Sequence, residues 1–502
     1  MAKGAEVQEA HPHLPRRRRI TVLLICSMSL LIVGLDVTIV NVALPSIRKD
    51  LHATFSSLQW TVDAYTVVLA SLLLLSGSTA DRLGRRRVFQ VGLTLFGLGS
   101  LACGLAPSVG ALILFRALQA IGGSMLNPVA MSIIRNVFED PRERAQAIGV
   151  WGAMVGLSLA LGPVVGGALV DSLGWRSVFF VNVPVVAAAI LLTALFVPES
   201  RAARPRRVDL PGQLLVVVGL ASLTYAIIAG GEHGFSSADV IALFAVAGAT
   251  LGGLIAWELR TYQPLIELRF FRSLPFSGAS AIAVFAFAGQ GGFLLLNTLY
   301  LQAVRGLSPL HAGLYTLPMA GMTLVLAPLS GRLTGYRGPR LPLALGGLLI
   351  AVAGYLLTRI TVTSPTGYLL GTYFCFGAGF GLINPPITNT AVSGMPPEQA
   401  GVAAGVASTS RQVGQTLGVA VLGAVAAGSV SGRIGPGFAV ATHPAWWIVV
   451  GLGAGIVLLG IVTTGRFALA TAARTAKALK EREAAKRRLR EGERARQLAG
   501  VL

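Results

Sequence analysis

The stretch SGSTADRLGRRRVF, residues 76–89, places one acid and four arginines between two long apolar segments. Such a charge cluster is unusual in this chain, because 54% of its 502 residues are hydrophobic and only 12% are charged. Soluble domains contain about 25% charged residues. The pattern therefore predicts a short polar loop that joins two helices buried in a membrane.

The apolar residues along the rest of the chain occur in blocks of similar length. A helix needs roughly 20 apolar residues to cross the hydrocarbon core of a bilayer, and helices satisfy their own backbone hydrogen bonds in lipid. We therefore predict an all-α polytopic membrane protein with fourteen transmembrane helices. The expected spans are 20–40, 57–76, 88–106, 109–131, 146–170, 177–197, 210–230, 238–257, 275–299, 310–330, 341–360, 366–390, 401–426 and 445–465.

The basic residues are distributed unequally between the two sides of the predicted membrane. Most of the 41 lysines and arginines fall in loops on the side of the N-terminus. Cytoplasmic loops are enriched in Lys and Arg, so we expect both termini in the cytoplasm and the protein in the cytoplasmic membrane. The net charge of +20 then reflects topology and not a nucleic-acid site. The exceptions on the other side are Arg48, Lys49, Arg176, Arg305, Arg359 and Arg433.

The chain also contains an internal repeat. LSGSTADRLGRRR at 75–87 matches LSGRLTGYRGPR at 329–340, and GGSMLNP at 122–128 matches GFGLINP at 379–385. A third pair, ERA at 143–145 and EQA at 398–400, recurs at nearly the same offset. Two parallel halves of this kind permit transport by rocking of one half against the other.

The repeat defines the predicted domains. They are a cytoplasmic tail at 1–19, a six-helix bundle at 20–200, a linker with two extra helices at 201–272, a second six-helix bundle at 273–465, and a basic cytoplasmic tail at 466–502. The last tail is expected to form a charged helix. Two roles stay open for it: contact with anionic lipid headgroups, or a solvated helix that only fixes orientation.

Several motifs resemble those of the major facilitator superfamily, in its fourteen-span drug:proton antiporter branch. GSTADRLGRRRVF at 77–89 resembles the loop signature between spans 2 and 3, with Thr79 in place of an apolar residue. RALQAIGGS at 116–124 resembles the span 4 motif, with Ala120 in place of glycine. Further similar segments are LDVTIVNVALP at 35–45, GLSLALGPVVGG at 156–167, WRSVFFVNVP at 175–184 and SRQVGQTLGVAV at 410–421.

This resemblance implies a major facilitator fold and an exporter of drug-like compounds. The excess of arginine over lysine, 36 to 5, and the abundance of alanine and glycine are typical of a high-GC bacterium. The segment at 156–167 resembles the antiporter motif of span 5, which the family associates with export. Its small residues allow close helix packing, and its proline frees a backbone carbonyl and bends the helix. Ordinary small-residue packing is the alternative interpretation. The motif residues are Gly156, Gly162, Pro163, Gly166 and Gly167.

The charged loop is interpreted as a conformational latch. Gly77 and Gly84 allow close approach of helices, and Asp81 can accept hydrogen bonds from a neighbouring helix N-terminus. Arg82 and Arg85 stay on the cytoplasmic side. Charge that serves only to set topology would explain the arginines but not Asp81.

Charged groups deep in the spans are the strongest functional signal, because they are costly in lipid and usually line a pathway. Asp36 in the first span and Arg116 in the fourth are expected to form a proton-coupling pair, with Asp63 as a further candidate. A static salt bridge that only orients the spans is the alternative.

The substrate surface is predicted from one helical face of the ninth span. Gln290, Phe293, Asn297 and Tyr300 share that face by their spacing, and aromatic rings with amides suit a large apolar molecule. The amides could instead join helices. Asn127 and Asn384, each followed by proline, predict broken helices at equivalent places in the two halves, which point toward a central site. Together with Arg411, the well-buried charge of the second half, they are further candidates for the substrate surface.

Together these features predict a proton-coupled efflux transporter of lipophilic or drug-like compounds. A dedicated exporter of one metabolite, lipid or siderophore is the alternative, and a membrane-embedded enzyme or a channel is disfavoured. The transporter is expected to need no cofactor and no metal, because the proton gradient drives it. Its expected partners are the substrate, protons and the lipid bilayer, and it is expected to be a monomer. Cys26, Cys103 and Cys375 are too scattered for a disulfide framework.

Overall fold

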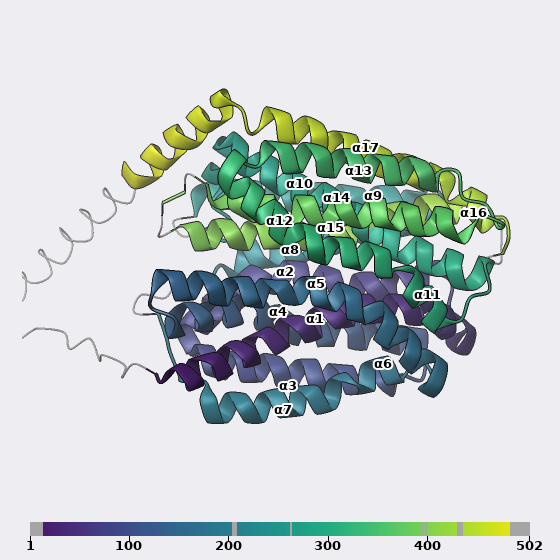
Figure 1. The fold of residues 1–502 in the computed structure, drawn as a ribbon, viewed down its shortest axis with the longest axis horizontal. Helices are drawn as coiled ribbons and strands as arrows, with labels where there is room; N and C mark the ends of the chain where they lie inside the picture. The colour runs from purple at the N-terminus through teal and green to yellow at the C-terminus, as the bar shows by residue number, and fades with distance from the viewer. Residues whose placement is uncertain are drawn as a thin grey trace, which may run out of the picture.

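The computed structural model describes residues 14–202, 208–261, 264–393, 395–396, 399–428 and 435–481. Parts of the predicted tails, most of the loop 201–207 and Glu398 of the third repeat motif lie outside the described residues. All the regular structure within the described ranges is helical (Figure 1).

The helices fall into an N-terminal half, an inserted hairpin and a C-terminal half. The N-terminal half contains α1 (Arg16–Leu51), α2 (Phe55–Leu83), α3 (Arg85–Gly104), α4 (Val109–Val137), α5 (Pro141–Leu173), α6 (Ser177–Phe180) and α7 (Asn182–Phe196). The hairpin contains α8 (Leu210–His233) and α9 (Ala238–Arg260). The C-terminal half contains η1 (Leu268–Arg272), α10 (Leu274–Leu299), η2 (Tyr300–Val304), α11 (Pro309–Tyr315), α12 (Leu317–Arg337), α13 (Arg340–Leu357), α14 (Thr366–Val392), α15 (Ala400–Gly428), α16 (Phe438–Ala441) and α17 (His443–Val462).

The predicted number of transmembrane helices agrees with the described structure. By length and composition, 13 helices or helix pairs can cross a membrane. The remaining long helix, α15, has 29 residues but carries the polar side chains of Arg411, Gln412 and Gln415. Since α15 lies between α2 and α10 inside the bundle, it completes the predicted fourteen. The all-α polytopic fold is therefore confirmed.

The ends of several helices differ from the sequence prediction. Helix α1 extends to Leu51 instead of ending near residue 40, and α5 begins at Pro141 because Asp140 accepts hydrogen bonds from the Arg142 and Glu143 backbone N–H groups. The span predicted over 310–330 is divided into α11 and α12.

Helices α4 and α14 correct a second expectation. Both continue through their prolines, although broken helices were predicted at these places. Each proline instead packs against a glycine of a neighbouring helix. A Cβ atom at Gly77 would lie 3.8 Å from the Pro128 Cβ, and one at Gly331 would lie 3.9 Å from the Pro385 Cβ. The repeated motifs thus form the same contact in both halves.

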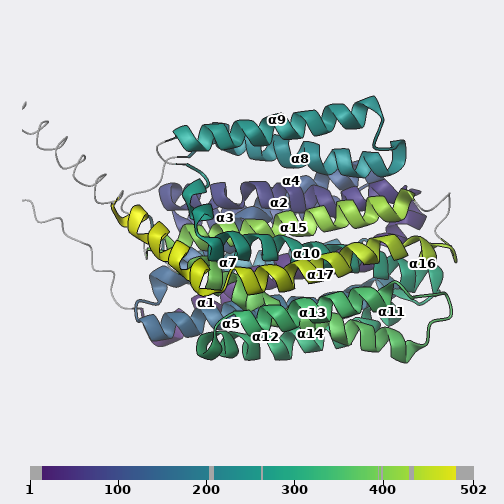
Figure 2. The same cartoon turned by 90° about the horizontal axis from the view of Figure 1, so that it is seen from above.

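The inserted hairpin touches both halves. Helix α8 contacts α2 and α15, whereas α9 packs mainly on α8 and forms the outermost layer (Figure 2). We use "terminal end" for the end of the bundle that holds Arg16 and residue 481, and "distal end" for the opposite end (Figure 1).

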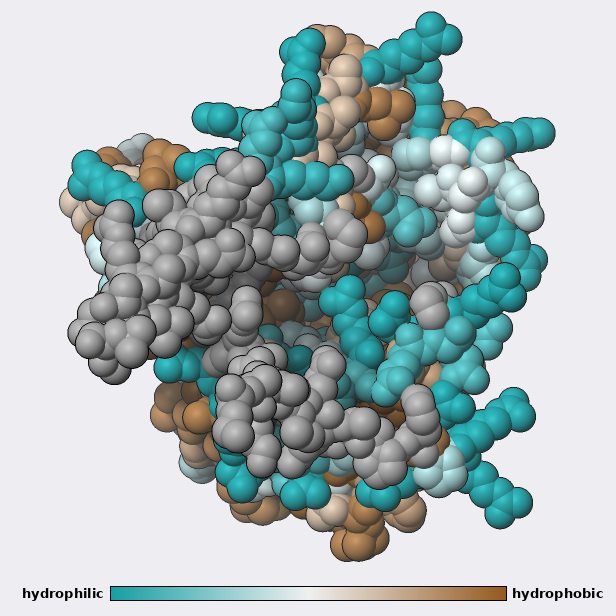
Figure 3. All heavy atoms as spheres, turned by 90° about the vertical axis from the view of Figure 1, so that its left-hand side faces the viewer, coloured by the Kyte–Doolittle hydropathy of each residue, from teal (hydrophilic) through white to brown (hydrophobic). Residues whose placement is uncertain are grey.

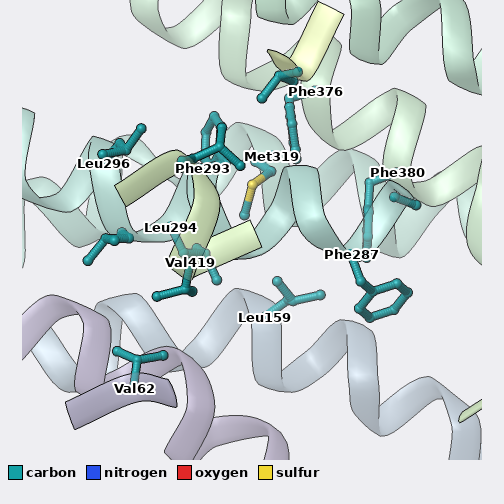
Figure 4. Packing of buried hydrophobic residues seen from close by; sticks show 14 of the residues in the cluster. Val62, Leu159, Phe287, Phe293, Leu294, Leu296, Met319, Phe376, Phe380 and Val419 are labelled. Atoms are coloured by element: carbon teal, nitrogen blue, oxygen red, sulfur yellow. The ribbon is translucent and has the colours of Figure 1, made fainter. Parts of the chain in front are cut away.

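A hydrophobic cluster crosses the boundary between the halves. Val62 of α2 and Leu159 of α5 belong to the same buried cluster as Leu294 of α10 and Val419 of α15 (Figure 4). A second cluster lies wholly in the N-terminal half. Burial of apolar side chains thus stabilises the N-terminal half internally and also joins it to the other half.

Hydrogen bonds between the halves concentrate at the distal end. The Gln302 side chain donates to the Val42 carbonyl at 2.9 Å, and the Gln59 side chain donates to the Val419 carbonyl at 3.1 Å. At the terminal end the space-filling view shows a recess between the two halves (Figure 3). The hydrogen bonds described between the halves therefore lie mainly toward the distal end. At the terminal end the halves also approach each other, since a Cβ atom at Gly401 of α15 would lie 2.9 Å from the Arg135 guanidinium of α4.

Candidate functional site

The predicted pair of Asp36 and Arg116 is in direct contact. Asp36 lies in the middle of α1 and Arg116 in the first half of α4, and their exposed fractions are 0% and 1%. The Arg116 guanidinium donates to Asp36 Oδ2 at 2.5 Å. An ion pair so deeply buried has a large desolvation cost, which only good geometry and further hydrogen bonds offset.

Amides supply those further hydrogen bonds. Gln119 donates to Asp36 Oδ1 at 2.8 Å and accepts from Arg116 at 2.7 Å. Asn182 donates to the same Asp36 oxygen at 3.2 Å, and the Ser100 hydroxyl accepts from Asn182 at 3.0 Å. Both oxygens of the carboxylate are therefore satisfied by donors from α4 and α7.

The cation is held on its other side by α2. The Arg116 Nε atom donates to the Thr61 carbonyl at 3.2 Å, and the guanidinium lies 4.2 Å from the centre of the Tyr65 ring. Cation–π contacts are strongest where water is excluded. Removal of the charge on Asp36 would thus change the balance of forces on four helices at once: α1, α2, α4 and α7.

Asp63 lies outside this network. Its side chain is completely buried and its Oδ1 atom accepts a hydrogen bond from Thr66 at 3.3 Å, while Oδ2 has no partner. The Thr66 hydroxyl in turn accepts from Thr416 of α15 at 2.8 Å. Asp63 therefore stands beside a contact between the halves and is shielded from water in this conformation.

The glycines of the antiporter motif form two faces of α5. One face packs on α1, because Cβ atoms at Gly162 and Gly166 would collide with Thr38 and Ile39. The other face meets the C-terminal half: a Cβ atom at Gly167 would lie 2.6 Å from the Leu310 Cα. Gly156 lies near Leu324 of α12, and the Pro163 carbonyl lies against Gly313 of α11.

In the charged loop, the partners differ from the prediction. The Asp81 carboxylate accepts from the Arg85 side chain at 3.0 Å, not from a helix N-terminus. The start of α3 is satisfied by Glu199, whose Oε1 accepts from the Arg86 backbone N–H at 3.1 Å. Gly84 has a φ of 112°, which favours glycine at this turn. All of these groups belong to the N-terminal half, and the Arg82 side chain is exposed.

The predicted substrate face of α10 is buried within the C-terminal half. The Phe293 ring stacks on Phe376 with centroids 4.4 Å apart, and Asn297 accepts from the Tyr373 hydroxyl at 2.9 Å. Tyr300 donates to the Thr361 carbonyl at 2.6 Å. These contacts favour the alternative that the face joins helices. Gln290 is likewise 6% exposed.

The other predicted substrate residues lie elsewhere in the two halves. Arg411 donates to the Thr388 hydroxyl and lies 5.9 Å from the Phe287 ring centre, but its Nε atom has no partner. The Asn127 Oδ1 atom is also buried without a partner, and Asn384 is partly buried. The structure does not bring these side chains into contact with the Asp36 network.

Sequence reasoning missed Gln119 and Asn182. Both lie within segments whose motifs were recognised, RALQAIGGS and WRSVFFVNVP. An amide three residues after a buried arginine was the available signal, because residues i and i+3 share a helical face.

Comparison with known proteins agrees with the resemblance that the sequence motifs show. The sequence model of the Major Facilitator Superfamily matches residues 26–419. The multidrug resistance protein Stp of Mycobacterium tuberculosis is 37% identical over 84% of this chain and 78% of its own length. The tetracenomycin C resistance and export protein of Streptomyces glaucescens is 37% identical over 81% of this chain and 76% of its own length.

Solved structures share the fold. A bacterial homologue of the human lysosomal transporter Spinster, crystallised in an inward-facing conformation, aligns with a TM-score of 0.62 at 19% identity. The alignment covers 93% of this chain and 99% of the other.

Proposed function

Because this chain belongs to the major facilitator superfamily, we propose that it exports lipophilic, drug-like molecules from a bacterial cytoplasm in exchange for protons. The chain is a multi-pass membrane protein of bacterial type, and its family points to a transporter, not an enzyme. Export of antibiotics is supported by relatives named for multidrug resistance and for tetracenomycin C export.

The observation that carries the coupling proposal is the buried Asp36–Arg116 pair. Ionisable residues inside a membrane are costly and mark proton or substrate pathways. A proton on Asp36 removes the charge that holds Arg116, so loading and unloading of the proton alters the packing of α1 against α4. Each proton that crosses the membrane supplies about 2.3 kcal/mol per 100 mV. No cofactor is required in this mechanism, and one chain suffices.

The proposed orientation places both termini, and therefore the terminal end, in the cytoplasm. The recess then opens toward the side from which an exporter takes its substrate. The basic loops on this side support that orientation. Alternating access requires the distal contacts between the halves to break while the terminal end closes.

The test is uphill efflux by Asp36→Asn. We expect loss of concentrative efflux in proteoliposomes with an imposed proton gradient, while downhill exchange of substrate continues. Asp239→Asn, at an exposed acid of α9, is the matched control. Uphill efflux by Asp36→Asn that is still abolished by an uncoupler would place the coupling acid elsewhere, with Asp63 as the next candidate.

A dedicated exporter of one compound is the second candidate. It is favoured by the relative that is named for a single antibiotic, tetracenomycin C. Expression in a pump-deficient host, with a panel of chemically unrelated antibiotics, distinguishes the two. Resistance to one structural class supports dedicated export, and resistance to several classes supports multidrug export.

A further inference from the structure

Two acids lie buried together at the terminal end of the inserted hairpin. Asp209 immediately precedes α8, and Glu258 lies in the last turn of α9. Their exposed fractions are 8% and 4%. Neither residue belongs to the Asp36 network or to any motif described above.

One oxygen of each acid has a structural partner. Asp209 Oδ1 accepts from the Gly212 backbone N–H at 3.0 Å and from the Trp257 ring N–H at 2.9 Å. Glu258 Oε2 accepts from the Ile266 backbone N–H at 3.4 Å. The pair therefore connects the start of α8, the end of α9 and the linker that leads to the C-terminal half.

The other oxygen of each acid is buried and has no hydrogen-bond partner. Both lie close to Gly212. A Cβ atom at Gly212 would lie 2.7 Å from Asp209 Oδ2 and 3.1 Å from Glu258 Oε1. The two free oxygens thus lie within about 6 Å of each other, a distance at which two buried negative charges repel strongly.

Among the described residues, no ion pair joins Asp209 or Glu258 to a cation. Glu267 in the linker adds a further negative charge that acts on Glu258. The nearest cation to Glu267 among the described ion pairs is Arg269, whose Nε atom lies 3.9 Å from the Glu267 carboxylate. Where α8 meets α2, the contact is uncharged: Gln213 donates to the Ser71 carbonyl at 2.6 Å.

Helix α8 connects this pair of acids to both halves of the molecule. Near its start, α8 is bonded to α2 of the N-terminal half through Gln213. Near its end, a Cβ atom at Gly231 would lie 2.9 Å from Ala424 of α15, in the C-terminal half. A change at the start of α8 therefore acts on a helix that touches both halves.

We propose that Asp209 and Glu258 together bind one proton, and that this shared proton holds α8 and α9 together at the terminal end. In the protonated pair, the O–H group of one carboxylic acid donates to the free oxygen of the other, ionised, carboxylate. Loss of the proton to water leaves two carboxylates, and their repulsion separates α9 from the start of α8. This inference adds a second proton site to the proposed function, and it concerns the hairpin itself.

The experiment uses the full chain in lipid nanodiscs without substrate, so that it does not depend on transport. Cys26, Cys103 and Cys375 are replaced, and spin labels are attached at the exposed positions 214 of α8 and 259 of α9. Electron resonance gives the label distance between about pH 5 and about pH 9, a range that brackets perturbed carboxyl groups. We expect the distance to increase as pH rises.

Three variants test the assignment. Glu258→Gln and Asp209→Asn imitate the protonated pair, so the label distance should stay short at every pH. Glu232→Gln, at an exposed acid of α8, should behave as the unchanged chain does. Infrared spectra should show a carboxylic acid band that disappears on raising the pH and is lost in the Glu258→Gln/Asp209→Asn chain.

Two results would overturn the proposal. One is a label distance and an infrared spectrum that do not depend on pH in the unchanged chain, which needs no variant to fold. The other is a distance that responds to added Na⁺ at constant pH, since the two free oxygens would then hold a metal cation instead of a proton. Loss of efflux in Asp36→Asn would change neither the label distance nor the infrared spectrum of the hairpin acids, so this test is independent of the coupling test.

Discussion

The carboxylate of Asp171 in α5 accepts hydrogen bonds from the Leu310 backbone N–H at 3.0 Å and from the Ser308 hydroxyl at 2.9 Å. Leu310 lies in the first turn of α11, where the helix dipole favours a negative charge. An acid of the N-terminal half thus caps a helix of the C-terminal half. This contact must break whenever the halves separate at the distal end.

We therefore expect Asp171→Asn to weaken distal closure. A carboxylate at a helix N-terminus contributes about 0.3–1 kcal/mol at an exposed site, so the ratio of closed to open states should fall up to about fivefold. Spin labels at exposed positions 173 and 440 report the distance between the halves at this end. Asp239→Asn serves as the control, and an unchanged distance distribution in Asp171→Asn would remove the cap from the mechanism.

A second prediction compares two glycines of α5. Gly167→Val should abolish efflux, because a side chain there would collide with the Pro309 and Leu310 backbone across the interface. Gly152→Val is the matched control, since a Cβ atom at Gly152 has no neighbour within 4 Å and both changes carry the same helix-propensity cost. Efflux is compared at equal expression. Equal activity of the two variants would mean that close packing of α5 on α11 is not required.

The membrane spans could be predicted because long apolar blocks report the environment of each segment directly. The prolines of α4 and α14 led to a wrong prediction, because proline usually marks a break in a helix. Pro128 and Pro385 remove a backbone donor each, which suggests a break, but packing on Gly77 and Gly331 keeps α4 and α14 continuous. Contacts with a partner helix decide the outcome, and a local sequence does not contain them.

Topology is tested by single cysteines in a background without native cysteines. A cysteine at position 336, whose native Tyr336 is 90% exposed in the last turn of α12, should resist an impermeant reagent in intact cells. A cysteine at position 235 in the α8–α9 turn should react. Permeabilised cells provide the control, because both positions should then react. The reverse pattern in intact cells would invert the proposed orientation.

The charged loop leads to a prediction that separates stability from transport. Asp81→Asn removes a partly exposed ion pair with Arg85, which contributes about 0.2–1 kcal/mol. Thermal stability should therefore change little, while efflux falls if Asp81 has a different partner when the terminal end is closed. The measurement is the unfolding temperature in detergent beside efflux in cells. Loss of both together would indicate a purely structural role.

The candidate site was only partly predictable. Asp36 and Arg116 stood out because ions are rare in lipid, and two opposite charges in one bundle tend to pair. The spacing of Phe293, Asn297 and Tyr300 correctly placed them on one face, but spacing does not tell whether a face meets a cavity or another helix. Here it meets Phe376, Tyr373 and the Thr361 backbone.

The last prediction decides whether the buried pair couples protons or only orients helices. Arg116→Gln leaves the buried Asp36 carboxylate without its cation, and breaking a buried pair in this way costs about 3–5 kcal/mol. Adding Asp36→Asn removes the unpaired charge, and the new amide can still bond to Gln119 and Asn182. The Asp36→Asn/Arg116→Gln chain should therefore recover most of the lost stability. Under a purely orienting role, efflux would recover with it. Under proton coupling, the stable double variant should still fail to pump uphill, because no group remains in this network that can carry the proton. Unfolding temperature and uncoupler-sensitive efflux, measured on the same preparations, distinguish these outcomes: a double variant that is stable and pumps uphill would reduce the pair to a structural salt bridge.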